Sequence, residues 1–111
     1  MGQPSVGTVV VIRFPFSDLK GSKLRPALVV AKAEFDNLIL CQITSKPYSS
    51  KIAVPIEKKD FQSGQLPLTS YVRPDKIFTA DQSIISTTVG DLKPAVLKNI
   101  LHNVTALFIA A

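Results

Sequence analysis

The chain has 111 residues, a length typical of one domain with a modest hydrophobic core. Hydrophobic residues make up 46% of it and charged residues 19%, a composition that excludes a chain disordered throughout. Lysine and arginine outnumber aspartate and glutamate by 13 to 8, and the net charge of +5 favours a polyanionic partner, either nucleic acid or an acidic protein segment.

The single cysteine and the single histidine exclude several kinds of site. One cysteine cannot form an intramolecular disulfide, and with one histidine it cannot supply an ordinary zinc site. Cys41 follows an apolar run and is expected to be buried. The sequence has no phosphate-binding glycine loop, no signal-peptide pattern and no membrane-spanning run. We therefore expect a cytoplasmic protein that uses no metal or other cofactor and does not enter a membrane.

Apolar, β-branched runs predict three strands in the first half of the chain. They cover residues 8–14, 25–31 and 38–44, and the first is too apolar to alternate cleanly, as a strand buried on both faces is. The segment 17–23 is rich in turn residues and is expected to form a loop. Asp36 and Asn37 form a typical turn pair between the second and third runs.

Shorter extended segments follow at 52–56, 70–73 and 76–79, the last two separated by Pro74. Strands this short and closely spaced favour a small barrel over a parallel sheet. The charged segment 57–60 is expected to face solvent.

Only the C-terminal segment predicts a helix. Asp91 is expected to cap it, and Pro94 suits its first turn. His102 falls on the polar side and is expected to face solvent, whereas apolar residues recur at helical spacing and predict one buried stripe: Leu97, Ile100, Leu101, Val104, Leu107 and Phe108. The expected fold is mainly β (α+β), a small barrel with a C-terminal amphipathic helix in one domain over residues 1–111.

Two polar constellations at strand ends suit a phosphodiester. Arg25 precedes Pro26, which holds it extended, and a planar guanidinium binds a phosphate through two hydrogen bonds. Thr44, Ser45 and Lys46 end an apolar strand with two hydroxyls and an ammonium, which are suitable phosphate ligands. The alternative interpretation is that Arg25 is a solubilising charge at a strand end and that Thr44, Ser45 and Lys46 form the end of a strand and a polar turn.

A third constellation is Arg73-Pro74-Asp75. Pro74 holds Arg73 extended, and residues two apart on an extended segment project to one side, with Cα atoms about 6.5 Å apart. A proton acceptor and a cationic donor side by side can flank one phosphodiester. The alternative is an exposed ion pair that contributes little to stability.

Taken together, these residues resemble the MazF/PemK family of toxins, also called Kid-type toxins. The resemblance covers nearly the whole chain, in the order GTVVVIRFPF from Gly7, GSKLRPALVV from Gly21, QITSK from Gln42, SYVRPDKIFTAD from Ser70, and the closing helix. It implies an SH3-like β-barrel assembled as a two-fold homodimer, with single-stranded RNA bound in a groove across the dimer. It also implies a cognate acidic antitoxin that blocks this groove.

The resemblance implies an activity and residue roles as well. The chain is similar to sequence-specific, metal-independent endoribonucleases (mRNA interferases) of type II toxin–antitoxin systems, in which the RNA 2′-hydroxyl attacks the adjacent phosphorus. By position, Arg25 and Thr44 match the catalytic residues of MazF-like members, and Arg73 and Asp75 match the pair proposed for Kid-like members. The further residues expected to bind RNA are Lys20, Lys23, Ser45 and Lys46.

Two other functions remain open at this point. A gyrase-poisoning toxin shares the barrel and the helix but cuts nothing; such toxins are similar to one another in a tryptophan near the C-terminus, and this chain has no tryptophan. A catalytically silent barrel that binds RNA or protein needs no matched set of arginine, threonine and aspartate. Cleavage of a long RNA in the presence of EDTA separates both functions from a ribonuclease.

Overall fold

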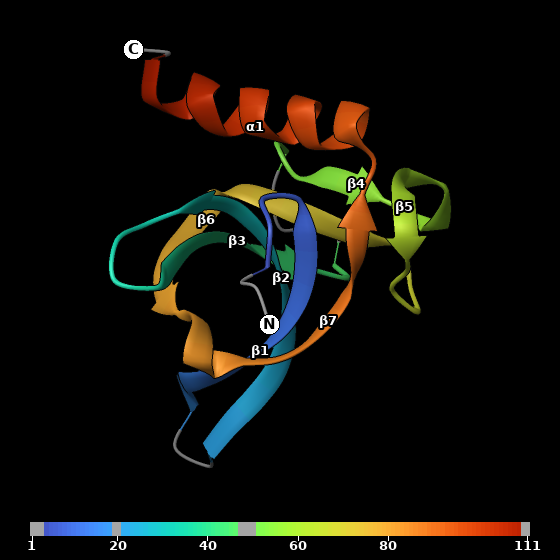
Figure 1. Ribbon diagram of the computed structural model, residues 1–111. Helices are drawn as coiled ribbons and strands as arrows, with labels where there is room; N and C mark the ends of the chain where they lie inside the picture. The colour runs from blue at the N-terminus through green and yellow to red at the C-terminus, as the bar shows by residue number, and fades with distance from the viewer. Residues whose placement is uncertain (1–3, 19–20, 47–50, 110–111) are drawn as a thin grey trace.

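A computed structural model describes residues 4–18, 21–46 and 51–109 (Figure 1). Their elements follow one another as β1 (Thr8–Asp18), β2 (Gly21–Lys32), β3 (Asn37–Thr44), β4 (Val54–Ile56), η2 (Lys58–Asp60), β5 (Phe61–Gly64), β6 (Ser70–Asp81), η3 (Gln82–Ile84), β7 (Ile85–Leu92) and α1 (Pro94–Ile109). Within these ranges no helix has both the length and the apolar character that crossing a bilayer requires.

The strands form one sheet in the order β4-β6-β3-β2-β1-β7-β5, and the paired strands all run antiparallel. The sheet curls into a nearly closed barrel, and α1 lies over one side of it (Figure 1). The mainly β fold with a C-terminal helix, predicted from the sequence, is confirmed.

Strands β1, β2 and β3 are buried on both faces, which the sequence predicted for β1. Val9 and Val10 are neighbours in β1 with no exposed surface, yet they belong to two different hydrophobic clusters. The first cluster includes Ile100 and therefore lies on the side that α1 covers. The second is packed against partly buried side chains of β6, η3 and β7: Phe78, Ala80, Ile84 and Ile85. One face of the central strands is thus buried under α1, and the curled sheet buries the other face against β6, η3 and β7.

The prediction of a loop over residues 17–23 was wrong at both ends of that range. Strand β1 extends to Asp18 and β2 begins at Gly21, and these two residues pair with each other across the hairpin. Cross-strand pairing therefore continues through residues whose local preference is for a turn. The turn between β2 and β3 is shifted by one residue from its expected place, because Phe35 and Asp36 carry its positive φ angles of 59° and 62°.

Three further differences concern the second half of the chain. The two segments expected on either side of Pro74 are one strand, β6, and the strand expected at 52–56 is shorter, because β4 begins at Val54. Strand β7 was not predicted, since its exposed Ser86, Thr87 and Thr88 give it no apolar alternation.

The helix begins at Pro94, as expected, but Asp91 does not cap it. Asp91 lies in β7, where its carboxylate accepts hydrogen bonds from Thr8 Oγ1 at 2.7 Å and Ser63 Oγ at 3.2 Å. The first turn of the helix instead begins at Lys93, whose carbonyl oxygen accepts the amide hydrogen of Leu97 at 3.0 Å. The carboxylate therefore links β7 to its two neighbouring strands, β1 and β5.

The predicted apolar stripe of α1 is buried only in part. Ile100 is fully buried, and the core contacts the helix as far as Val104. The prediction was wrong for Leu107 and Phe108, which are 40% and 74% exposed because the core does not reach that part of the helix. His102 is exposed, as predicted.

Replacement of Ile100 by alanine tests this packing. We expect Ile100→Ala to lower the free energy of unfolding by about 2–5 kcal/mol, because it opens a cavity in the cluster beneath α1. The control is Phe35→Ala, a truncation to the same residue at a position that is 85% exposed, which should change stability by no more than about 0.5 kcal/mol. Equal effects of the two substitutions in urea denaturation would contradict this packing.

Candidate functional site

A hollow of about 560 Å³ lies where β2 begins and β3 ends. These two strand ends meet because β2 and β3 pair antiparallel, with Ala27 opposite Gln42. The hollow collects five of the residues singled out from the sequence: Lys23, Arg25, Thr44, Ser45 and Lys46. Lys20, the remaining lysine of that prediction, lies outside the described residues.

Arg25 is exposed at the mouth of this hollow. It sits in the extended part of β2, opposite Ile12 of β1, and the following Pro26 pairs with Val11. In the part of the chain that the structure describes, the Arg25 side chain has no hydrogen bond or ion pair. Its guanidinium is therefore available to an external anion.

Thr44 offers a hydroxyl whose orientation is set by the backbone. Its Oγ1 accepts a hydrogen bond from the amide of Lys46 at 3.1 Å. Because one acceptor site is used in this way, the hydroxyl hydrogen is left to donate to a ligand. Ser45 and Lys46 are exposed directly beside it, so one short segment presents two hydroxyls and an ammonium.

The Arg73–Asp75 pair lies on β6, beside β3 but outside the lining of the hollow. Thr44 pairs with Tyr71, and burial alternates along β6, so that Tyr71, Arg73 and Asp75 project to the face opposite to buried Val72. The structure thus places the two predicted catalytic pairs on adjacent strands.

Arg73 and Asp75 form a forked ion pair. Arg73 Nε donates to Asp75 Oδ1 at 3.2 Å, and Nη2 donates to Oδ2 at 2.8 Å. This hydrogen bonding is the largest cause that holds the pKa of Asp75 below its ordinary value of 3.8, and the charges of Arg73 and Lys76 act in the same direction. Asp75 is therefore ionised at neutral pH, and its proton affinity is weakened.

Cys41 is buried, as predicted, and it is not a nucleophile candidate. Burial, followed by the nearby charge of Asp75, raises the pKa of its thiol to about 11. The thiol is thus protonated at neutral pH, whereas the thiolate is the reactive form. Across the described ranges, no three histidine, cysteine, aspartate or glutamate side chains gather as a metal site would require.

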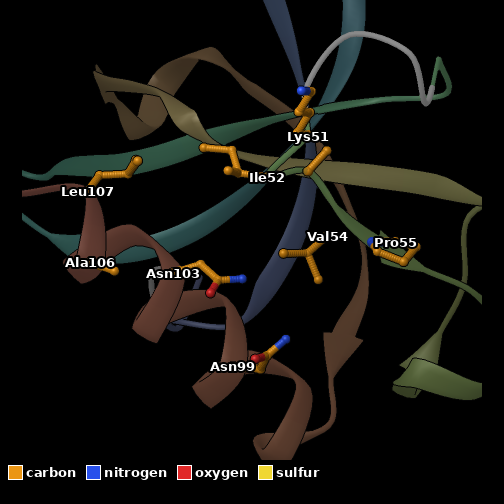
Figure 2. A pocket seen from close by; sticks show the side chains of 9 residues that line it. Lys51, Ile52, Val54, Pro55, Asn99, Asn103, Ala106 and Leu107 are labelled. Atoms are coloured by element: carbon orange, nitrogen blue, oxygen red, sulfur yellow. The ribbon is translucent and has the colours of Figure 1, made fainter. Parts of the chain in front are cut away.

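A second hollow, of about 620 Å³, lies between α1 and the segment that leads into β4 (Figure 2). Figure 2 shows Asn99 and Asn103 on the helix, across from Val54 and Pro55. Among the described residues of its lining, Lys51 is the only cation and none is a predicted site residue. These residues therefore lack the combination of cations and hydroxyls found at the ends of β2 and β3.

The apolar part of the first hollow was not predicted from the sequence. Its lining includes Leu24 and the segment 66–68, together with the predicted cations and hydroxyls. Nothing in the sequence around Leu66 or Leu68 points to a ligand, because only the folded chain brings this connection between β5 and β6 to the end of β3.

A family profile described as PemK-like, MazF-like toxin of type II toxin–antitoxin system matches residues 5–108. No curated protein sequence matches the chain significantly.

Several solved structures share the fold. The crystal structure of MazE-MazF (Form-II) from Deinococcus radiodurans has a TM-score of 0.77 and 20% identity over 100% of both chains. An endoribonuclease in complex with its cognate antitoxin, from Mycobacterial species, has a TM-score of 0.70 and 21% identity over 99% of this chain and 96% of that chain. An endoribonuclease from Mycobacterial species has a TM-score of 0.70 and 22% identity over 99% of this chain and 94% of that chain. At these identities the likeness shows the fold alone.

The ion pair on β6 leads to a prediction about the pKa of Asp75. Arg73→Gln should raise the pKa of Asp75 towards 3.8, because it removes the largest cause of the lowered value. Lys76→Gln is the matched control and should raise it less, since the charge of Lys76 is the smallest of the causes. NMR titration of the Asp75 carboxyl carbon measures both changes. An unaltered Asp75 pKa in Arg73→Gln would show that the forked pair does not form in solution.

Proposed function

The chain belongs to the family of PemK-like, MazF-like toxins of type II toxin–antitoxin systems, and we propose on that basis that it is an endoribonuclease that cuts single-stranded RNA without a metal ion. The observation that carries the proposal is the hollow at the ends of β2 and β3, whose lining includes Arg25, Thr44 and Ser45, and the Arg25 side chain has no hydrogen bond or ion pair in the part of the chain that the structure describes. Two proteins of similar fold are named as endoribonucleases.

Phosphodiester binding follows from the charge of this hollow. The planar guanidinium of Arg25 can donate two parallel hydrogen bonds to two oxygens of one phosphate, and Lys23 and Lys46 in the same lining add positive charge. Thr44 and Ser45 donate hydroxyl hydrogens to the same phosphate oxygens. Such contacts bind the backbone of a single strand and strengthen as negative charge grows on the phosphate oxygens.

The proposed reaction begins with the RNA 2′-hydroxyl. A base removes its proton, the 2′-oxygen forms a bond to the adjacent phosphorus, and the bond to the 5′-oxygen of the next nucleotide breaks, with this leaving oxygen taking up a proton from water. The products are a 2′,3′-cyclic phosphate and a 5′-hydroxyl. Asp75 is our candidate base, and Arg73 stabilises the charge that develops, since an arginine is a poor proton donor. Arg25 binds the scissile phosphate and Thr44 orients it.

The positions of the two pairs allow one RNA strand to contact both. Tyr71 lies opposite Thr44, and Asp75 is four residues further along β6, where the register with β3 is irregular: Ile43 pairs with Val72, and Cys41 pairs with Ile77. An RNA strand that leaves the hollow along this face therefore passes Arg73 and Asp75. The lowered pKa of Asp75 keeps it in its basic form but weakens it as a base, so the alternative is that Arg25 and Thr44 carry the chemistry and the β6 pair binds RNA.

The proposal includes two partners. A homodimer of about 24 kDa, twice the chain mass of 12.0 kDa, is supported by apolar residues that stay exposed at the end of α1: Leu107, Phe108 and Ile109. An acidic antitoxin segment is the second partner, because it would compete with RNA for the cations of the hollow. One structure of similar fold is that of an endoribonuclease in complex with its cognate antitoxin, and another is that of MazE-MazF.

Metal-free cleavage is the direct expectation. The purified protein should cut a long single-stranded RNA at a short sequence in the presence of EDTA, and end mapping should find 2′,3′-cyclic phosphates and 5′-hydroxyls. The Arg25→Ala protein, purified in the same way, controls for contaminating nucleases. Cleavage that EDTA abolishes and magnesium restores would contradict the proposal, as would activity that persists unchanged in the control preparation.

A comparison of two substitutions assigns the base. Asp75→Asn keeps the shape of the side chain and should lower kcat by about 10²–10⁴-fold if Asp75 removes the proton. Thr44→Val removes only the hydroxyl and should have a smaller effect on kcat in that case. Both variants should stay folded, because neither replaces a core residue. A fully active Asp75→Asn beside an inactive Thr44→Val would assign the chemistry to the hollow and overturn the role of Asp75.

A further inference from the structure

The hollow at the ends of β2 and β3 has an apolar part that phosphate binding does not use. Leu24 and the segment 66–68 contribute to its lining, alongside the cations and hydroxyls. Leu68 is 65% exposed and Leu24 is 54% exposed. Isolated exposed leucines are common on protein surfaces. These two instead line the same hollow as Arg25, whose side chain has no hydrogen bond or ion pair in the described part of the chain.

A buried serine and strand pairing fix the position of the segment that carries Leu68. Ser70 is 5% exposed, and its hydroxyl donates a hydrogen bond to the carbonyl oxygen of Leu68 at 3.0 Å. Ser70 also begins β6, where it pairs with Ile56 of β4. Pro67 restricts the backbone just before Leu68. An apolar surface fixed before a ligand arrives binds it at a lower entropic cost.

A nucleobase is the chemical group that this apolar surface fits. In RNA, an apolar planar face lies next to every phosphodiester, so a hollow that binds the phosphate through Arg25 and Thr44 necessarily has a base nearby. Among the described residues that line the hollow, none is aromatic, and the leucines and Pro67 offer no side-chain donor or acceptor. Contact with the face of a base is therefore apolar, without hydrogen bonds to the base edge.

We propose that Leu24 and Leu68 hold one nucleobase next to the scissile phosphate by apolar contact with its face. This subsite rests on the proposed function, because it needs an RNA strand in the hollow. Since every base has an apolar face, the contact contributes affinity and alignment at this position and discriminates little between bases. The protein then recognises the cleavage sequence through bases at other positions of the RNA.

The test is a thermodynamic cycle between one side chain and one base. The kcat/KM of the wild type and of Leu68→Ser is measured on a short RNA that contains the mapped cleavage sequence. The same measurement is made on RNAs with a base-free nucleotide at each position next to the scissile bond. Leu68→Ser should lower kcat/KM about tenfold on the intact RNA. Removal of one particular base should lower wild-type kcat/KM by a similar factor and have no further effect on Leu68→Ser.

Two other variants complete the experiment. Leu24→Ser should reproduce the result at the same base, which protects the conclusion against a folding defect in a single variant. Phe35→Ser is the control: Phe35 is 85% exposed in the turn between β2 and β3, at the far end of both strands, and its replacement should leave kcat/KM unchanged.

The subsite would be overturned if Leu68→Ser had the wild-type kcat/KM on every RNA. It would also be overturned if the substitution and the removal of a base lowered kcat/KM independently at every position, so that their factors multiply. Cleavage that still depends on Arg25 would then leave the proposed function intact. If the wild type cuts no RNA, the proposed function fails, and the same cycle is measured as binding of a 2′-O-methyl RNA. Additive losses in that binding measurement overturn the apolar subsite, and non-additive losses support it.

Discussion

The antiparallel pairing of β1, β2 and β3 is the constraint on which the rest of the structure depends. Both faces of these strands are buried, so a shift of one residue in their register would exchange the residues of the two hydrophobic clusters. That register also fixes which polar residues meet at the end of the sheet. Because Ala27 lies opposite Gln42, Arg25 and Thr44 come to the same end, and the core thereby determines the geometry of the candidate site.

Charge is arranged differently on the two sides of this site. In the hollow, Arg25 has no carboxylate partner among the described residues, so its charge is available to an anion. On β6, Arg73 is engaged with Asp75, and this pair presents almost no net charge until a ligand separates it. The arrangement favours phosphate binding in the hollow and proton transfer or positioning on β6. A polyanionic substrate or an acidic segment would be attracted to the hollow more than to the β6 pair, because Arg25 has no carboxylate partner among the described residues.

The sequence allowed the prediction of those features that local pattern determines. The apolar runs of the central strands, the helix that starts at Pro94 and the strand-end residues Arg25 and Thr44 were all recognisable without a structure. Features that depend on tertiary contact were not recognisable. Asp91 is of a residue type that often caps a helix, yet its carboxylate accepts hydrogen bonds from hydroxyls of β1 and β5 inside the sheet. Leu68 carries no signal at all, because its relation to the hollow arises only when β6 pairs with β3 and β4.

The central claim is that the guanidinium of Arg25 binds the scissile phosphate, and single-turnover cleavage of a short RNA tests it most directly. The account predicts that Arg25→Ala lowers the cleavage rate by about 10²–10³-fold, as loss of a donor to a developing negative charge does. Arg25→Lys should recover only part of this loss, because a lysine lacks the planar fork of the guanidinium. Lys98→Ala removes the same charge from an exposed position on α1 and should cleave at the wild-type rate. Cleavage by Arg25→Ala at the rate of Lys98→Ala would contradict the account.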